Sequence, residues 1–256
     1  MKKTILISIL IFTFVNVKSN PKLDSIFYIH YNLGLNTIIG KGDVSLPYGV
    51  GLAENNIGPG FGMGLGLEVL LRKKWGVRIS GGIGAHGTNR SKFEKSLKES
   101  FPGENFISDD NGYFSHGLSG ATTIGWMASL SYDIEFEKLI LRPRLNFGYV
   151  YGGAVKYSYV LRTPASNLIT NHSIYGSSDG ASQIGIGVEI SPKNYRPVSF
   201  YVNFNGSRFV NNYKATINDV YGNNEVKNFS SNYSVSFLNL GINLGFDIFM
   251  PREPIN

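Results

Sequence analysis

The chain has 256 residues, of which 42% are hydrophobic and 16% charged, with 31 Gly, 17 Phe, 15 Tyr and no Cys. Charged residues usually make up about a quarter of a soluble domain and Gly about 7%. The low charge and the abundant Gly and aromatic residues therefore argue against a disordered chain and against a coiled coil. Without Cys there is no disulfide framework, thiolate metal site or Cys nucleophile, and the length suits one large all-β domain or two small ones.

Residues 1–19 have the pattern of a secretory signal peptide. Lys2 and Lys3 precede an apolar run over residues 5–15, and cleavage is expected after Ser19. The run is too short for a comfortable membrane-spanning helix. Removing residues 1–19 lowers the net charge from +6 to about +3, so the basic balance gives no support for nucleic-acid binding, which needs a clustered basic face.

The rest of the chain alternates apolar and polar residues with a period of two. Every second residue is apolar from Phe27 to Leu35, and again from Phe61 to Leu71, where Gly and Glu68 stand between, with Leu70 as the one exception. This is the pattern of a strand with one apolar and one polar face. Similar runs cover about 75–86, 120–136, 139–159, 182–191, 198–210 and 234–249. The total is about eight strands, an even number as in bacterial membrane barrels.

The connections between these strands alternate in length. Tight connections lie at 72–74, 137–138 and 192–197, and long polar ones near 40–58, 87–119, 160–181 and 211–233. Short turns on one side and long loops on the other are typical of a transmembrane β-barrel. The sequence therefore predicts an all-β, antiparallel up-and-down barrel with both chain ends on the periplasmic side. A soluble barrel or sandwich is the alternative.

The charged residues of these strands fall on the face opposite the apolar one. Since an Arg or Lys facing the bilayer midplane costs roughly 2–4 kcal/mol, that face is expected to be the lumen. The charges lie near short turns or near the chain's end, which predicts a mixed ion cluster close to the periplasmic mouth. An eight-stranded barrel is only wide enough for side chains to fill, so the cluster is expected to plug the lumen, with a narrow ion or proton path as the alternative. The predicted cluster comprises Glu68, Arg78, Asp133, Glu135, Arg142, Arg144, Glu189 and Asp247.

The hairpin at 137–138 makes two further predictions. Asp133 and Glu135 are expected to face Arg142 and Arg144 across the two strands. Pro143, on the lipid-facing side, lacks the N–H that a strand ladder needs, which predicts a bulge there or a later start of the strand.

The last predicted strand carries a recognisable pattern. Asn239-x-Gly241-x-x-Leu244-x-Phe246 has the form polar-x-Gly-x-x-hydrophobic-x-hydrophobic, and the pattern recurs from Asn243 to Met250. It resembles the signal by which the barrel-assembly machinery recognises a last strand. Over residues 26–250 the chain resembles the small eight-stranded outer-membrane barrels of the OmpA and OmpX kind.

This resemblance implies a monomer in the bacterial outer membrane, with lipopolysaccharide and the barrel-assembly machinery as partners, an unknown extracellular ligand and no cofactor. Residues 20–25 are then a periplasmic lead-in, and residues 251–256 a C-terminal tail. The tail is a departure, since the chain continues past Phe249 instead of ending on an aromatic residue. Amphipathic rings settle at membrane interfaces, which fits Trp75, Tyr132, Phe136, Tyr149 and Tyr151.

The segment from Gly82 to Gly87 satisfies the G-x-G-x-x-G pattern of a dinucleotide-binding loop. Such a loop needs repeated β-α-β alternation, which the sequence lacks, so these glycines are interpreted as strand residues that face the lumen.

A short helix is predicted in the second long loop. Ser91 and Glu94 have the spacing of a capping box, and Phe93, Leu97 and Phe101 form an apolar stripe suited to resting on the barrel rim. The lysines around the stripe suggest, as an alternative role, contact with anionic lipopolysaccharide or a surface partner. They are Lys92, Lys95 and Lys98.

Outer-membrane enzymes are a rival class, because lipid-modifying enzymes of this architecture use His with Ser and omptin-like proteases use Asp and His at the mouth. Asp109, Asp110 and His116 share one loop and could form an acid–base pair. His30, His86 and His172 are scattered, no strand carries His-x-Ser, and no two His have metal-ligand spacing. The prediction is therefore a non-enzymatic, metal-free anchor for surface loops that serve adhesion, binding or envelope integrity, with a narrow channel second and an enzyme third.

Overall fold

The structure is a computed structural model, and it describes residues 25–41, 45–50, 52, 54–71, 74–106, 120–152, 155–164, 166, 168–193 and 198–247. The predicted signal peptide and C-terminal tail lie outside the described residues, as do residues 20–24 of the predicted lead-in.

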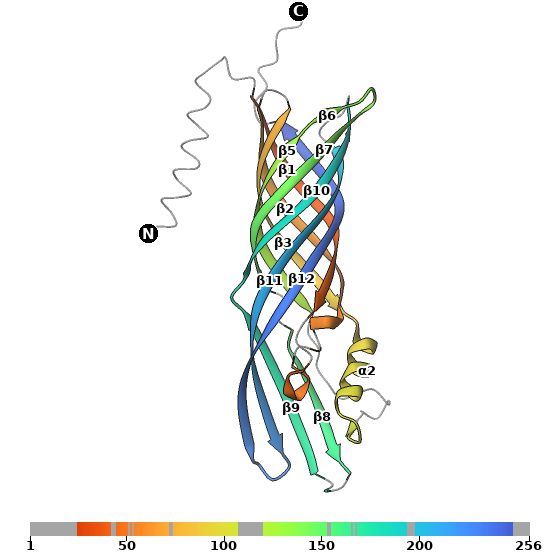
Figure 1. The fold of residues 1–256 in the computed structure, drawn as a ribbon, viewed down its shortest axis with the longest axis vertical. Coiled ribbons are helices and arrows are strands. Elements are labelled where there is room, and N and C mark those ends of the chain that lie inside the picture. Colours follow the sequence, from red (N-terminus) through yellow and green to blue (C-terminus); the bar gives the residue numbers. More distant parts are fainter. Residues whose placement is uncertain are drawn as a thin grey trace, which may run out of the picture.

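Eight antiparallel strands form a closed ring (Figure 1). They are β1 (Ser25–Lys41), β2 (Ile57–Leu71), β3 (Trp75–Thr88), β5 (Ala121–Tyr132), β7 (Leu139–Gly152), β10 (Ala181–Pro192), β11 (Val198–Asp219) and β12 (Asn224–Asp247). Each strand pairs with the next in this series, and β1 pairs with β12 from Lys41↔Ser234 to Tyr28↔Asp247. Closure leaves the ring without a free edge. The predicted up-and-down barrel is confirmed.

The two faces of the ring have the polarity of a membrane barrel. Large apolar side chains point outward and are exposed, as at Leu65 (59% exposed) and Ile186 (62%). Polar and charged side chains such as Glu68 and Asn146 are buried in the lumen. A soluble barrel has the opposite arrangement, whereas an outward apolar band and a polar interior suit lipid as the surrounding solvent. No helix in the described ranges is long and apolar enough to cross a membrane.

Aromatic side chains lie near both borders of this band, as predicted. Trp75 packs edge-on against Tyr132 near the periplasmic turns, with ring centroids 4.9 Å apart. Towards the other end of β7, Tyr149 and Tyr151 pack with centroids 4.8 Å apart.

The extracellular side contains more strand than the sequence predicted. The strand predicted over 139–159 ends with β7 at Gly152, and the segments read as loops at 160–181 and 211–233 are mostly strands. β8 (Tyr157–Thr163) and β9 (Leu168–Ser178) form a hairpin, β9 pairs with the outer part of β11, and the two-residue β4 (Asn105–Phe106) pairs with β8. Figure 1 shows this sheet extending below the ring. The outer face of this sheet is rich in Asn and Ser, which gave its strands the composition of loops. For that reason the alternating apolar residues of its inner face were not recognised as strand residues.

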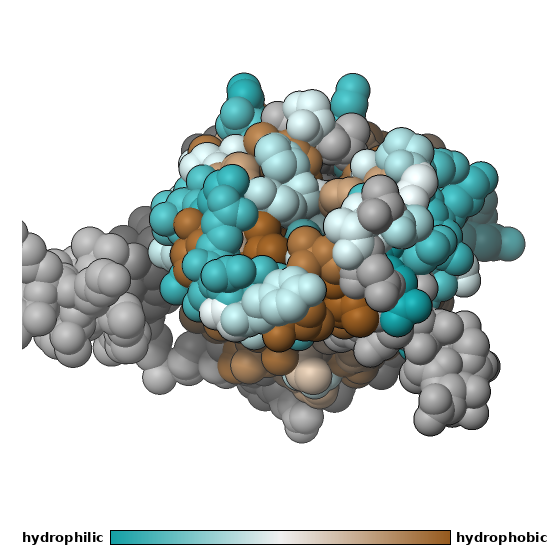
Figure 2. All heavy atoms as spheres, turned by 90° about the horizontal axis from the view of Figure 1, so that it is seen from below, coloured by the Kyte–Doolittle hydropathy of each residue, from teal (hydrophilic) through white to brown (hydrophobic). Residues whose placement is uncertain are grey.

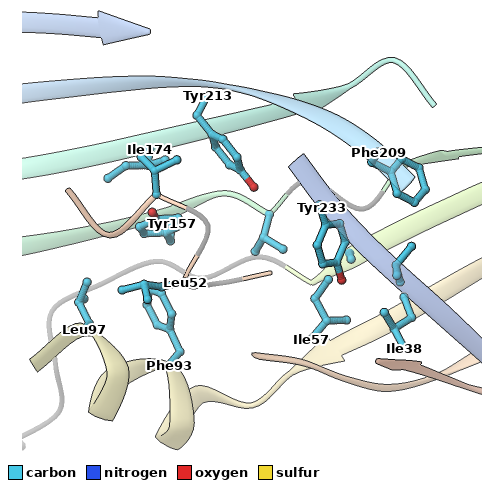
Figure 3. Packing of buried hydrophobic residues seen from close by; sticks show 14 of the residues in the cluster. Ile38, Leu52, Ile57, Phe93, Leu97, Tyr157, Ile174, Phe209, Tyr213 and Tyr233 are labelled. Carbon is cyan, nitrogen blue, oxygen red and sulfur yellow. The ribbon is translucent and has the colours of Figure 1, made fainter. Parts of the chain in front are cut away.

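The other long connections hold short helices. η2 (Pro47–Gly49) and η3 (Glu54–Asn56) lie between β1 and β2, and α2 (Arg90–Ser100) follows β3. We call the described residues from Ser45 to Asn56 the plug loop. Its Val50 and Leu52 join one hydrophobic cluster with the inward residues of the ring and of the extended sheet, among them Ile57 and Tyr213 (Figure 3).

The predicted helix and its apolar stripe are confirmed, because Phe93 and Leu97 of α2 are fully buried in this cluster and Phe101 packs against it. The predicted capping box is wrong. The N-cap is Asn89, whose side chain accepts a hydrogen bond from the backbone N–H of Lys92. Asn is as good a cap as Ser, and here it lies two residues before Ser91.

The predicted bulge at Pro143 is absent from the described pairing, and β7 does not start late. Pro143 lies opposite Val188 of β10 in an unbroken register. On its other side the ladder from β5 stops at Ser131↔Arg144 and resumes in the same register at Ile134↔Leu141, as β6 (Ile134–Glu135). Because proline has no N–H to donate to the neighbouring strand, the ladder breaks opposite Pro143. The irregularity therefore falls in the strand predicted over 120–136, which is divided into β5 and β6, and not in β7.

Candidate functional site

Most of the predicted ion cluster is present in the lumen at the periplasmic end. Each of its members is at most 6% exposed, so these charges are removed from water. They are Glu68 (β2), Arg78 (β3), Asp133 (between β5 and β6), Arg142 and Arg144 (β7) and Glu189 (β10). We call this set the lumen cluster.

The two glutamates lie at the centre of the lumen cluster. Glu68 Oε2 is 2.9 Å from Arg78 Nη2 and 3.3 Å from Arg142 Nη1. Glu189 Oε2 is 3.3 Å from Arg78 Nη2, and it also contacts Arg144 Nη2. Arg144 Nη2 is in turn 3.6 Å from Glu68 Oε1. Each carboxylate is therefore shared among guanidinium groups from different strands.

Asp133 completes the balance of charge. Arg142 donates to both of its oxygens, from Nε to Oδ1 at 2.5 Å and from Nη2 to Oδ2 at 3.0 Å. Such a bidentate pair is among the stronger charge-assisted interactions. With three arginines and three acids the lumen cluster is formally neutral, as a buried ionic group must be to avoid a large desolvation penalty.

One histidine, one serine and one asparagine from the remaining strands join the lumen cluster. His30 Nε2 of β1 is 2.6 Å from Glu68 Oε2. Ser199 of β11 and Asn243 of β12 donate to Glu189 at 2.7 and 2.8 Å. The cluster therefore spans the cross-section of the lumen. These three residues are not marked by the pattern of acidic and Arg residues that predicted the cluster, although all three lie on the lumen face of their strands.

The two other predicted members have different outcomes. Glu135 does not belong to the cluster: its side chain is 36% exposed and lies 3.4 Å from Lys193. β6 lies at the periplasmic end of the barrel (Figure 1). At that end even side chains on the inward-facing positions of a strand are in contact with water. The backbone of Asp247 pairs opposite Tyr28, but its side chain lies outside the described part of the structure, so its membership stays a prediction.

A polar cavity of about 160 Å³ lies in the lumen beyond the cluster. Arg78 and Arg144 line one end of it, and Val150 and Phe237 of the hydrophobic cluster line the other. Asn and Gly residues dominate the wall between, including Gly82 and Gly84 of the G-x-G-x-x-G segment, which lies within β3. The third glycine of the segment, Gly87, is exposed on the other face of the strand, so the prediction that all three face the lumen is wrong for Gly87. Polar walls of this kind suit ordered water.

Tyrosine hydroxyl groups fix the plug loop over the extracellular mouth. Tyr159 donates to the carbonyl oxygen of Tyr48 at 2.8 Å, and Tyr157 donates to that of Gly49. Tyr233 of β12 donates to the carbonyl oxygen of Glu54 at 3.4 Å. Tyr48 itself has φ 59°, ψ 23°, a left-handed conformation that is uncommon outside glycine. The loop is thus held by specific contacts in a constrained shape.

The side chain of Glu54 is the only buried acid described outside the lumen cluster. It is 1% exposed, and its Oε1 accepts hydrogen bonds from Asn211 and Tyr213 of β11. Burial raises the pKa of Glu54 to about 6, outweighing hydrogen bonds from Tyr213, Asn211 and Ser231 that act in the opposite direction. No sequence motif marked this residue, because the segment read as a polar loop.

The residues considered for catalysis do not form a described site. His86 Nε2 lies 3.4 Å from the Thr123 hydroxyl oxygen, and His172 stacks on Tyr159 with centroids 4.7 Å apart. Burial lowers the pKa of His172 to about 4. The acid–base group predicted in the second long loop lies outside the described residues, so its geometry stays a prediction. It comprises Asp109, Asp110 and His116. Among the described residues no His, Cys, Asp and Glu gather in a group that could hold a metal.

No family model and no curated protein matches the chain. Solved structures of outer-membrane proteins are similar to it. A major outer membrane protein from Thermus thermophilus is 14% identical, with a TM-score of 0.43 over 87% of this chain and 100% of that one. OprG from Pseudomonas aeruginosa is 12% identical, with a TM-score of 0.42 over 86% and 95%. Neisserial surface protein A is 13% identical, with a TM-score of 0.36 over 86% and 97%.

Three features of the described structure, the closed ring, the polarity of its two faces and the charges in its interior, all fit a barrel that spans a membrane. The strands close without an edge, the outward band is apolar, and the buried charges are confined to the lumen. This is the arrangement that hydrocarbon outside and packed side chains inside require. The chain is a small eight-stranded antiparallel β-barrel with the polarity of a membrane-spanning barrel.

Proposed function

We propose that the barrel is a closed, monomeric anchor that carries a rigid β-sheet outside the membrane for binding. The observation that carries the proposal is that the lumen is filled at two levels. The lumen cluster occupies the periplasmic end, and the plug loop with α2 packs on the inward residues of the extracellular end. Figure 2, which views that end, shows apolar and polar side chains close together over the face.

Planar-bilayer recording tests the closed state. The wild-type barrel is expected to give no steady conductance. The double variant Arg142→Ala/Arg144→Ala is expected to lose stability and still give none, because the plug loop remains in place. A steady, ohmic current through the wild-type protein would contradict a closed anchor.

A narrow channel is the second candidate, and the polar cavity of about 160 Å³ favours it. In a channel the plug loop would act as a gate. Phe93→Ala, which removes a ring packed edge-on against Tyr157, should then raise the conductance well above that of the wild type. In a closed anchor the same variant only loosens the extracellular end, and the lumen cluster still blocks the current.

The turn between β11 and β12 offers a preorganised surface for a binding partner. Val220 and Tyr221 are 58% and 79% exposed at this turn. The Asp219 carboxylate accepts hydrogen bonds from the backbone N–H groups of Tyr221 and Asn223, both at 2.9 Å. Two exposed apolar side chains on a preorganised turn lose little conformational entropy on binding.

Cell adherence tests this surface. Bacteria that display the wild-type chain should adhere to cultured epithelial cells, and the double variant Val220→Ser/Tyr221→Ser should adhere less at equal surface amounts. A matched control is Asn232→Ser, an exposed polar position on β12. Equal adherence of the wild type and the double variant would remove the turn as the binding surface.

A further inference from the structure

The outward face of the barrel becomes basic just beyond its apolar band, on the side formed by β1, β12 and β11. In the apolar part, Leu238 lies between Thr37 and Phe204. Four residues further along each of these strands, on the same face and further from the apolar part, Ser234 lies between Lys41 and Arg208. Both cations are exposed. A row of two cations therefore borders the membrane where the lipid band ends.

A second group of cations lies further from the membrane on the same face. Lys214 of β11 is flanked by Tyr175 of β9 and Asn228 of β12. Together with Lys156 they line a shallow hollow of about 590 Å³. Tyr175 is 54% exposed.

The neighbouring row of the hollow adds hydrogen-bonding groups. Asn212 lies between Ser177 and Ser230, and Ser230 donates to Asn212 Oδ1 at 2.9 Å. None of the residues of these rows is acidic. The hollow therefore combines cations, one exposed aromatic ring and a set of amides and hydroxyls.

This face points away from the plug loop. On the intervening positions of the same strands, Ile174, Tyr213 and Ala215 are at most 2% exposed and belong to the hydrophobic cluster. Figure 3 shows Ile174 and Tyr213 on that inner side. Because neighbouring residues of a strand point to opposite faces, Lys214 and its row project outward, in line with the lipid-facing residues of β11.

The two groups of cations lie at different heights. Six residues separate Arg208 from Lys214 along β11, which is about 20 Å at roughly 3.4 Å per residue, and somewhat less along the membrane normal because barrel strands are tilted. A ligand that engages both must carry anionic groups at the membrane border and polar groups well above it. A simple phospholipid headgroup does not extend that far.

We propose that this face binds a phosphorylated glycolipid of the outer leaflet. Arg208 and Lys41 bind phosphate at the membrane border, since guanidinium and ammonium groups are strong donors to phosphate oxygens. Lys214 and Lys156 bind acidic groups on the sugar chain, and one sugar ring packs on Tyr175. The proposal does not depend on whether the lumen is closed.

The test measures glycolipid binding to the full-length barrel in detergent micelles. The probes are bisphosphorylated rough lipopolysaccharide, the same glycolipid after dephosphorylation, phosphatidylglycerol and inorganic phosphate. The wild type is expected to bind the first at least tenfold more tightly than each of the others. Lys41→Gln/Arg208→Gln should lose at least tenfold in affinity, and Tyr175→Ala/Lys214→Gln should lose affinity for the full sugar chain but not for bisphosphorylated lipid A lacking it.

The matched control is Lys92→Gln/Lys95→Gln, which removes two exposed cations from α2, the rival basic surface predicted from the sequence. It should bind like the wild type, and all variants should keep the heat-dependent shift in gel mobility of a folded barrel. Equal binding of the dephosphorylated glycolipid or of phosphatidylglycerol would overturn the proposal. So would an equal loss in the α2 control, which would assign binding to the helix.

Discussion

The hydroxyl group of Tyr213 donates a hydrogen bond to the carboxyl group of Glu54, a residue 159 positions earlier in the chain. One partner belongs to the plug loop and the other to the outer half of β11, so the contact ties the closure of the mouth to the extracellular sheet. Both side chains are nearly inaccessible, with 2% and 1% exposure. A buried acid in this position makes the closure sensitive to pH.

The plug loop should be held most firmly in acid. The pKa of Glu54 is raised from 4.5 to about 6, so burial favours its protonated form. The docked loop then has its full stability below about pH 4.5 and loses it as the pH rises through about 6, by ~2 kcal/mol at ~1.4 kcal/mol per unit. Hydrogen exchange of the amides of residues 45–56, corrected for intrinsic rates, should show protection falling over this range.

Glu54→Gln is the control for this prediction, because the amide keeps an acceptor oxygen and does not titrate. Its protection should vary little between pH 4 and pH 8. If the wild type and Glu54→Gln have the same pH profile, the titrating group lies elsewhere.

Removing one arginine from the lumen cluster should destabilise the barrel strongly. Arg142→Ala leaves Asp133 and Glu68 buried without this partner, and breaking a buried pair from one side typically costs about 3–5 kcal/mol. Lys193→Ala breaks only the exposed pair with Glu135 and should cost less than about 1 kcal/mol. Urea unfolding in lipid vesicles compares the two; similar costs would mean that the lumen cluster is not a buried network of ion pairs.

The ring could be predicted because a membrane barrel imposes a strict alternation on every strand. A single charged residue at the wrong parity would be costly in lipid, so Glu68, Arg78 and Glu189 marked the lumen directly. Register then brought them together without further information. The same rule failed at Glu135, since parity distinguishes two faces but does not show where the barrel ends and water begins.

The extracellular parts could not be predicted in this way, because no lipid constrains them. The apolar residues Phe209, Tyr213 and Ala215 do alternate, but Asn and Ser between them gave the segment the composition of a loop. Glu54 has no local signal at all. Its partners come from β11 and β12, and only the tertiary fold brings them to it.

The N-terminus of α2 offers a direct check on the corrected cap. Asn89→Ala removes the acceptor of the Lys92 N–H and should cost about 1 kcal/mol. Ser91→Ala should cost little, because Ser91 lies within the helix and Ala has the better helix propensity. Thermal unfolding of both variants, with protection of the α2 amides as a local readout, tests this; the reverse order of costs would restore the capping box.

The predicted assembly signal on β12 combines two kinds of residue. Gly241 faces Gly34 of β1 inside the barrel, and a Cβ atom there would lie 2.6 Å from the hydroxyl oxygen of Tyr201. Phe246 and Leu244 are 63% and 36% exposed on the lipid face, and Asn239 lines the lumen cavity. A substitution at Gly241 therefore affects packing as well as any recognition, whereas Phe246 separates the two.

Phe246→Ala should slow assembly in cells more than it lowers stability. The lipid-facing ring is replaceable by lipid in the folded barrel, while the recognition pattern needs a hydrophobic residue at this position. The measurement pairs the rate at which folded, heat-modifiable barrel accumulates in the outer membrane with the urea unfolding of the refolded protein. Ile242→Ala, on the same lipid face but outside both copies of the pattern, is the matched control, and equal assembly rates for the two variants would show that the copy from Asn239 to Phe246 is not the one that is read.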